Sequence, residues 1–154
     1  MKKLNSLLIL LTVLVISVSA QTAARKAQYN LAKSGLAIQG YDPVAYFVNS
    51  KAVEGKPEIA TEYNGVTYRF ATAKNKEAFT ANPAKYEPQY GGWCAYAMGS
   101  KGEKVEIDPQ TYKIVDGKLF LFYNKLLTNT LPMWNKDEAH LKTDADRNWT
   151  KFVH

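Results

Sequence analysis

Two segments of the chain alternate apolar and polar residues on either side of a tight turn. The first spans residues 58–70 and turns at Asn64-Gly65, and the second spans 112–123 and turns at Asp116-Gly117. Alternation puts successive side chains on opposite faces of a strand, and Asn-Gly or Asp-Gly is the strongest short-range hairpin signal. The pattern therefore predicts two β-hairpins.

Other segments have the spacing of helices. Thr72 can cap a helix that runs from Ala73 to Ala81 and that Pro83 stops. A capping box at Asn135 and Glu138 predicts a C-terminal amphipathic helix from Lys136 to about Lys151. Its apolar side chains recur at helical spacing, at Leu141, Ala145, Trp149 and Phe152.

Residues 1–20 have the pattern of a signal peptide. Lys2 and Lys3 precede an apolar run from Leu7 to Val18, and small residues follow up to Ala20. The run is shorter than the roughly 20 residues of a membrane helix. We therefore expect a periplasmic or secreted protein, with no membrane association after the signal is removed.

The composition is that of a folded domain. Of 154 residues, 46% are hydrophobic and 22% are charged, and the net charge is +6. The basic residues are spread thinly, which argues against a nucleic-acid partner, and nothing indicates the oligomeric state. We predict a small single-domain α+β fold, with a signal peptide at 1–20, an N-terminal arm or short helix at 21–35, and the domain itself at 36–154.

The single cysteine, Cys94, excludes an internal disulfide. If the chain is helical there, Met98 lies one turn away on the same face, and a thiolate with a thioether suits Cu(I). A third ligand would have to come from His140, Met133 or a tyrosine, and His140 is the candidate. The alternative interpretation makes Cys94 a small core residue, Met98 a gap filler, and His140 the surface ion-pair partner of Asp144.

Catalytic patterns are not apparent. A cysteine nucleophile needs a base, and the only histidines are His140 and His154. Phosphate-binding glycine loops and zinc spacings are lacking, so we expect a protein that is not an enzyme. A set of aromatic residues either lines a pocket for a flat ligand such as haem or fills the core: Tyr41, Tyr46, Tyr63, Tyr68, Tyr86, Tyr90, Trp93 and Tyr96.

Four motifs, GYDPVAYF at 40–47, YNGVTYRF at 63–70, NPAKY at 82–86 and PQYGGWCA at 88–95, resemble the exported branch of the YHS-domain family. The resemblance extends from about Leu36 to Trp149. It implies a small α+β domain that occurs alone or beside metal-handling proteins. Metal-trafficking members carry a cysteine after Asp-Pro-Val and another after the Tyr-x-Phe strand, where this chain has Ala45 and Ala71.

Two functions follow as expectations. The first is an exported, non-enzymatic binding domain that sequesters or passes a soft transition metal such as copper, with a metal ion or a metal-handling protein as its partner. The second is a metal-free structural or protein-interaction module, in which the Gly-Gly-Trp-Cys motif is a packing device beside a protein-binding surface. A redox enzyme is the least favoured, because Cys94 has no resolving cysteine.

Overall fold

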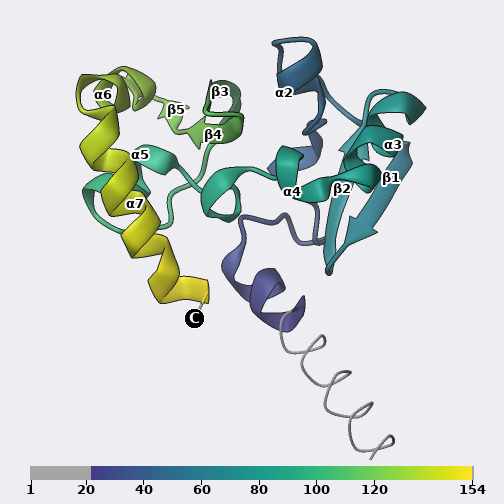
Figure 1. The fold of residues 1–154 in the computed structure, drawn as a ribbon, viewed down its shortest axis with the longest axis horizontal. Coiled ribbons are helices and arrows are strands. Elements are labelled where there is room, and N and C mark those ends of the chain that lie inside the picture. The colour runs from purple at the N-terminus through teal and green to yellow at the C-terminus, as the bar shows by residue number, and fades with distance from the viewer. Residues whose placement is uncertain (1–21, 154) are drawn as a thin grey trace, which may run out of the picture.

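The structure, a computed structural model, describes residues 22–153 (Figure 1). The segment predicted as a signal peptide lies outside the described residues. Within them, no helix combines the length and apolar character that crossing a membrane requires. The elements run in the order helical segment 22–28, η1 (Ile38–Gly40), α2 (Ala45–Val48), β1 (Lys56–Tyr63), β2 (Val66–Phe70), α3 (Ala73–Ala81), α4 (Pro83–Tyr86), η2 (Gln89–Gly92), α5 (Ala95–Ser100), β3 (Asp108–Val115), β4 (Lys118–Phe122), β5 (Asn124–Lys125), β6 (Thr128–Asn129), α6 (Leu131–Lys136) and α7 (Glu138–Val153).

The fold is a small single-domain α+β arrangement, as predicted, and both predicted hairpins are confirmed. β1 pairs with β2 and β3 with β4, each antiparallel. The turn residues Asn64, Gly65, Asp116 and Gly117 all have positive φ, at 48°, 80°, 51° and 69°. These are the left-handed values that a two-residue hairpin turn requires. β5 and β6 form a third hairpin that the sequence pattern did not indicate.

The strand β4 separates two hydrophobic clusters. Leu119 and Leu121 belong to the first cluster, with the aromatic residues of β2 and α3. Phe120 and Phe122 belong to the second, where both rings pack against Trp134 of α6. Figure 1 shows the corresponding division, with β1, β2 and α3 on one side and α5, α6 and α7 on the other. β4 is thus buried on both faces.

The C-terminal helix begins later than the sequence predicts. α6 ends at Lys136, Asp137 leaves the helical region at φ −151° and ψ 51°, and α7 starts at Glu138. The predicted capping box is wrong because both of its polar side chains bind Lys113 of β3. Asn135 Oδ1 accepts a hydrogen bond from Lys113 Nζ at 2.8 Å, and Glu138 forms a salt bridge with the same ammonium group.

The buried carboxylate of Asp42 joins three parts of the fold. Its side chain is fully buried, and Oδ1 accepts hydrogen bonds from the backbone N–H groups of Val44 at 2.8 Å and Ala45 at 3.3 Å. Oδ2 accepts from Ala71 N at 2.8 Å and from Asn75 Nδ2 at 2.7 Å. The turn before α2, the end of β2 and the first turn of α3 are therefore held by one side chain.

We predict that Asp42→Ala lowers the free energy of unfolding by more than about 2 kcal/mol, because it leaves several buried donors without an acceptor. Glu77→Ala, at an exposed position of the adjacent helix α3, is the matched control and should change it by less than about 0.5 kcal/mol. Urea denaturation measures both. Equal midpoints for the two variants would contradict the role given to Asp42.

A second prediction compares the two glycine turns. Gly117→Val should cost about 1–3 kcal/mol from backbone strain alone, because φ is +69° and a Cβ there would have no neighbour within 4 Å. Gly65→Val should cost more, because a Cβ would also lie 2.5 Å from Thr22 Cγ2. Gly117→Asn should be nearly neutral, since asparagine tolerates this conformation. Similar denaturation midpoints for all three variants would refute the turn assignment.

Candidate functional site

The thiol of Cys94 lies in the core, at the N-terminus of α5. Its side chain is fully buried, and Sγ accepts a hydrogen bond from Tyr123 N at 3.4 Å. Sγ also lies 3.4 Å from Thr130 Oγ1, whose hydroxyl donates to the carbonyl of Tyr123 at 3.0 Å. A hydroxyl has one proton, so in the contact with Thr130 the S–H of Cys94 is the donor. The hydrogen bond to Thr130 therefore requires the thiol form of Cys94.

The backbone before Cys94 folds tightly against aromatic rings. Tyr90, Gly91 and Gly92 have φ values of 55°, 60° and 85°, a run of three left-handed residues. A Cβ on Gly91 would lie 2.8 Å from atoms of both Trp149 and Tyr29, so only glycine fits there. The Gly-Gly-Trp-Cys segment is thus shaped by close packing of the N-terminal segment and α7.

The three candidate metal ligands have different surroundings. Met98 is fully buried in the cluster around Trp134, whereas Cys94 belongs to the cluster around β2 and α3. The side chain of His140 is 70% exposed on α7, where its ring nitrogens lie 3.3 Å from Asp137 Oδ2 and 3.1 Å from Asp144 Oδ2. His140 therefore has the ion-pair surroundings of the alternative interpretation.

The described residues also contain no group of three or more His, Cys, Asp and Glu side chains placed to hold a metal ion. The structure does not gather Cys94, Met98 and His140 into one site.

The aromatic residues mainly fill the core. Tyr46, Tyr68, Tyr86 and Tyr90 are at most 8% exposed. The hydroxyl of Tyr46 donates to Pro109 O at 2.9 Å, and that of Tyr90 donates to Asp146 Oδ1 at 2.9 Å. Burial raises the pKa of both tyrosines. These rings are packing elements, and the hydroxyl groups of Tyr46 and Tyr90 have hydrogen-bond partners.

The N-terminal segment packs on the domain through Glu87. The carboxylate of Glu87 accepts a hydrogen bond from Tyr68 Oη at 2.5 Å and forms a salt bridge with Arg25. Arg25 also donates to Tyr29 Oη at 2.9 Å. The pKa of Tyr68 is raised well above its ordinary value, first by burial and then by the charge of Glu87. The helical segment 22–28 is therefore part of the packed structure.

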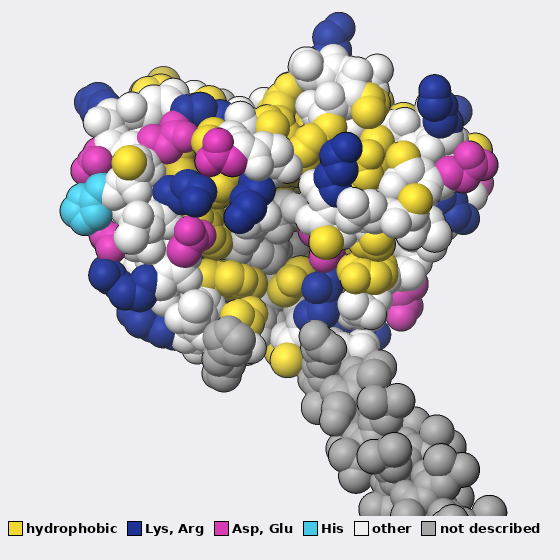
Figure 2. All heavy atoms as spheres, in the orientation of Figure 1, with side chains coloured by type: hydrophobic (Ala, Val, Ile, Leu, Met, Phe, Trp, Pro, Cys, Tyr) yellow, Lys and Arg dark blue, Asp and Glu magenta, His cyan; other side chains and the backbone are white. Residues whose placement is uncertain are grey.

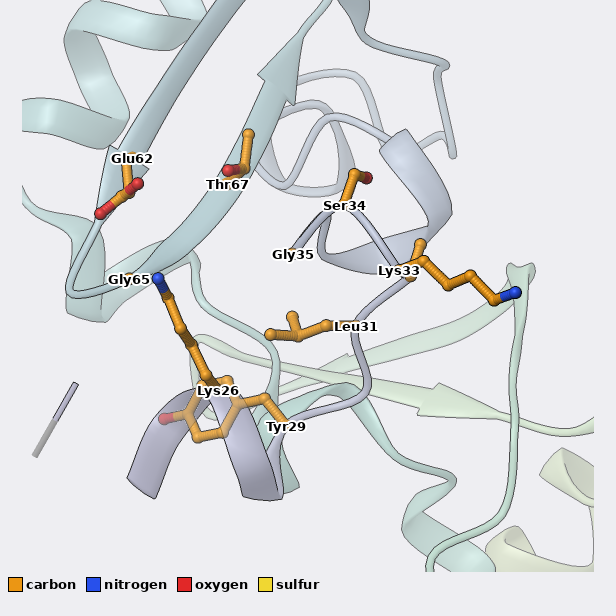
Figure 3. A pocket seen from close by; sticks show the side chains of 10 residues that line it. Lys26, Tyr29, Leu31, Lys33, Ser34, Gly35, Glu62, Gly65 and Thr67 are labelled. Atoms are coloured by element: carbon orange, nitrogen blue, oxygen red, sulfur yellow. The ribbon is translucent and has the colours of Figure 1, made fainter. Parts of the chain in front are cut away.

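A polar pocket of about 410 Å³ lies where this segment meets the first hairpin (Figure 3). Lys26 extends toward Gly65, and Glu62 of β1 lies on the hairpin side, while Lys33 points away from the other lining residues. Because the pocket combines groups of both charges, it favours no class of ligand. The face in Figure 2 likewise intersperses basic and acidic side chains.

A smaller cavity of about 160 Å³ reaches Cys94. Its lining is mainly apolar and includes Tyr96, Val105, Tyr123 and Thr130. Tyr123 and Thr130 stand at the two ends of the hairpin that β5 and β6 form. The cavity over the thiol therefore lies at the base of this third hairpin.

The tip of the third hairpin carries two exposed leucines, Leu126 and Leu127. Their exposed fractions are 92% and 110%, and their φ values are 50° and 67°. The other two hairpins fill the same left-handed positions with Asn-Gly and Asp-Gly. Leucine is unfavourable both in this conformation and in water. Positions that break a local rule in this way are typically functional or strained sites.

Sequence reasoning missed these leucines because the segment from Asn124 to Asn129 contains no turn-forming pair at its centre. The available signal was weak: two apolar residues lie midway between polar residues, in a chain that otherwise uses standard turn chemistry.

Comparison with known families identifies the central part of the chain. The model of the YHS domain matches residues 44–90, the stretch from the start of α2 to η2. It includes all the hydrogen-bond donors to Asp42. Searches of curated proteins and of solved structures found no match. The YHS family is associated with metal handling. The match covers less than half of the chain, and together with the small α+β fold it supports membership of the YHS-domain family.

Proposed function

We propose that this protein is an exported, non-enzymatic interaction module of the YHS family. The signal-peptide pattern of residues 1–20 supports export. The observation that carries the proposal is the exposed pair Leu126 and Leu127, held in a left-handed turn at the tip of a hairpin. In this function the Gly-Gly-Trp-Cys segment is a packing device that supports the base of that hairpin.

The third hairpin has the chemistry of a small docking element. Burying two leucines contributes about 1.5–3 kcal/mol each. The hairpin residues 124–129 include Lys125 and no acidic side chain. The partner that fits is a protein with an apolar groove and a carboxylate at its rim, a pairing that favours association and sets orientation.

Cys94 favours the metal-free form of this function. Its S–H donates a hydrogen bond to Thr130 Oγ1, and its sulfur accepts one from the backbone N–H of Tyr123. The side chain is fully buried. A metal ligand must be a thiolate, so binding would break the contact with Thr130. The nearest thioether in sequence, Met98, packs in the other cluster.

A soft metal such as copper is the second candidate. Two observations favour it: membership of a family associated with metal handling, and the cavity of about 160 Å³ that reaches Cys94. In this case Cys94 would be the main ligand, and a partner such as a metal-handling protein would supply others.

The reactivity of Cys94 distinguishes the two candidates. We predict that a maleimide reagent labels the native protein at least about tenfold more slowly than the protein in denaturant, since a buried thiol reacts only after opening. Excess Cu(I) should raise the melting temperature no more in wild type than in Cys94→Ser. A metal site would instead give rapid native labelling, protection by Cu(I), and a stabilisation that Cys94→Ser abolishes.

The leucine pair is tested by restoring standard turn residues. Leu126→Asn combined with Leu127→Gly should raise the free energy of unfolding by about 1 kcal/mol or more, because both substituents accept positive φ. A lowered or unchanged denaturation midpoint would show that the leucines are not held under strain.

The same pair should form the contact with the partner. A photocrosslinker at Leu127, in protein made by the producing cell, should yield one discrete adduct, and one at exposed Glu77 of α3 should not. An excess of wild-type protein without the crosslinker should reduce the yield of the adduct, whereas the variant with Leu126→Asn and Leu127→Gly should not. No adduct, or equal competition by both proteins, would refute the docking role.

A further inference from the structure

A cavity of about 590 Å³ lies between α2 and α3, away from Cys94. Five aliphatic residues contribute to its lining: Val44, Val48, Val53, Ala71 and Ala78. Val48 is 59% exposed, so its side chain is accessible at the cavity. In Figure 2, hydrophobic side chains are exposed in the region between α2 and α3, with basic side chains beside them. Its volume falls in the range of small-molecule sites.

The charges at this cavity have one sign. Lys51 and Lys74 line it, and none of the lining residues is acidic. Within residues 22–153, neither lysine takes part in a salt bridge. Both side chains are exposed, so their ammonium groups remain hydrated and available to a ligand.

The helix α3 adds to the positive potential. Thr72, Lys74 and Asn75, at its N-terminal end, line the cavity. The first turn contains no acidic side chain that would offset the positive end of the helix dipole. Asp42 is fully buried behind the lining residues Ala71 and Asn75, and both of its oxygens are occupied by donors.

We propose that this cavity binds a small organic anion with an apolar body, of the class of medium-chain monocarboxylates. The aliphatic side chains would hold the hydrocarbon part, and Lys51 and Lys74 would attract the carboxylate at the rim. An inorganic anion would leave the apolar lining unused, and a neutral hydrocarbon would leave the two lysines unused. The proposal is independent of the third hairpin and of Cys94.

The test compares hexanoate, acetate and 1-hexanol as probes of the full chain, by titration monitored in heteronuclear NMR spectra. Hexanoate should shift the amide signals of Val48, Lys51 and Lys74, with an affinity at least about tenfold above those of acetate and 1-hexanol. Lys51→Gln combined with Lys74→Gln should weaken the affinity for hexanoate about tenfold, since each exposed pair of opposite charges contributes only modestly to the binding free energy.

The matched control is Lys118→Gln combined with Lys136→Gln, which removes the same charge away from the cavity and should leave the affinity unchanged. Val48→Asp, which adds a carboxylate at an exposed position of the lining, should abolish binding without unfolding the protein. The proposal would be overturned if 1-hexanol bound as tightly as hexanoate, or if the control variant weakened hexanoate binding as much as the Lys51 and Lys74 variant does. It would also be overturned if hexanoate shifted only amide signals away from the cavity.

Discussion

The carboxylate of Asp42 is the interaction on which the central part of this fold depends. A buried carboxylate is costly unless its oxygens are fully hydrogen-bonded, and here both are. By accepting from Ala45 and Ala71, it brings the turn before α2 next to the end of β2. Metal-trafficking members of the family are expected to carry cysteines at these two positions. At both positions this chain has alanine, and each alanine donates its backbone N–H to Asp42.

The same framework supports both proposed surfaces. Through Asn75, Asp42 fixes the first turn of α3, which forms one wall of the cavity with Lys51 and Lys74. The strand β4, buried on both faces, leads to the third hairpin, and Cys94 packs between its end and Thr130. Figure 1 places β5 and α3 on opposite sides of the molecule. Cys94 and Met98 thus lie in the core, whereas the two proposed binding surfaces consist of exposed lysines and leucines.

Local signals account for what the sequence predicted. Asn64-Gly65, Asp116-Gly117 and the Thr72 cap act within a few residues, and the structure has each as expected, including the hydrogen bond from Asn75 N to Thr72 Oγ1 at 3.1 Å. The start of α7 was missed because Lys113, on a distant strand, binds the side chains of the apparent capping box. The sequence offered a buried Cys94 as one of two interpretations without deciding between them. The cavity beside α3 could not be read from sequence, since it arises from contacts between distant segments.

Native-state hydrogen exchange tests the role of Asp42 most directly. In Asp42→Asn, one oxygen is replaced by a donor, so the backbone amides of Val44, Ala45 and Ala71 should lose protection together with those of α3. The amides of the cluster around Trp134 should keep theirs, because none of its residues donates to this carboxylate. Loss of protection confined to Val44 and Ala45, with Ala71 and α3 unchanged, would contradict the account.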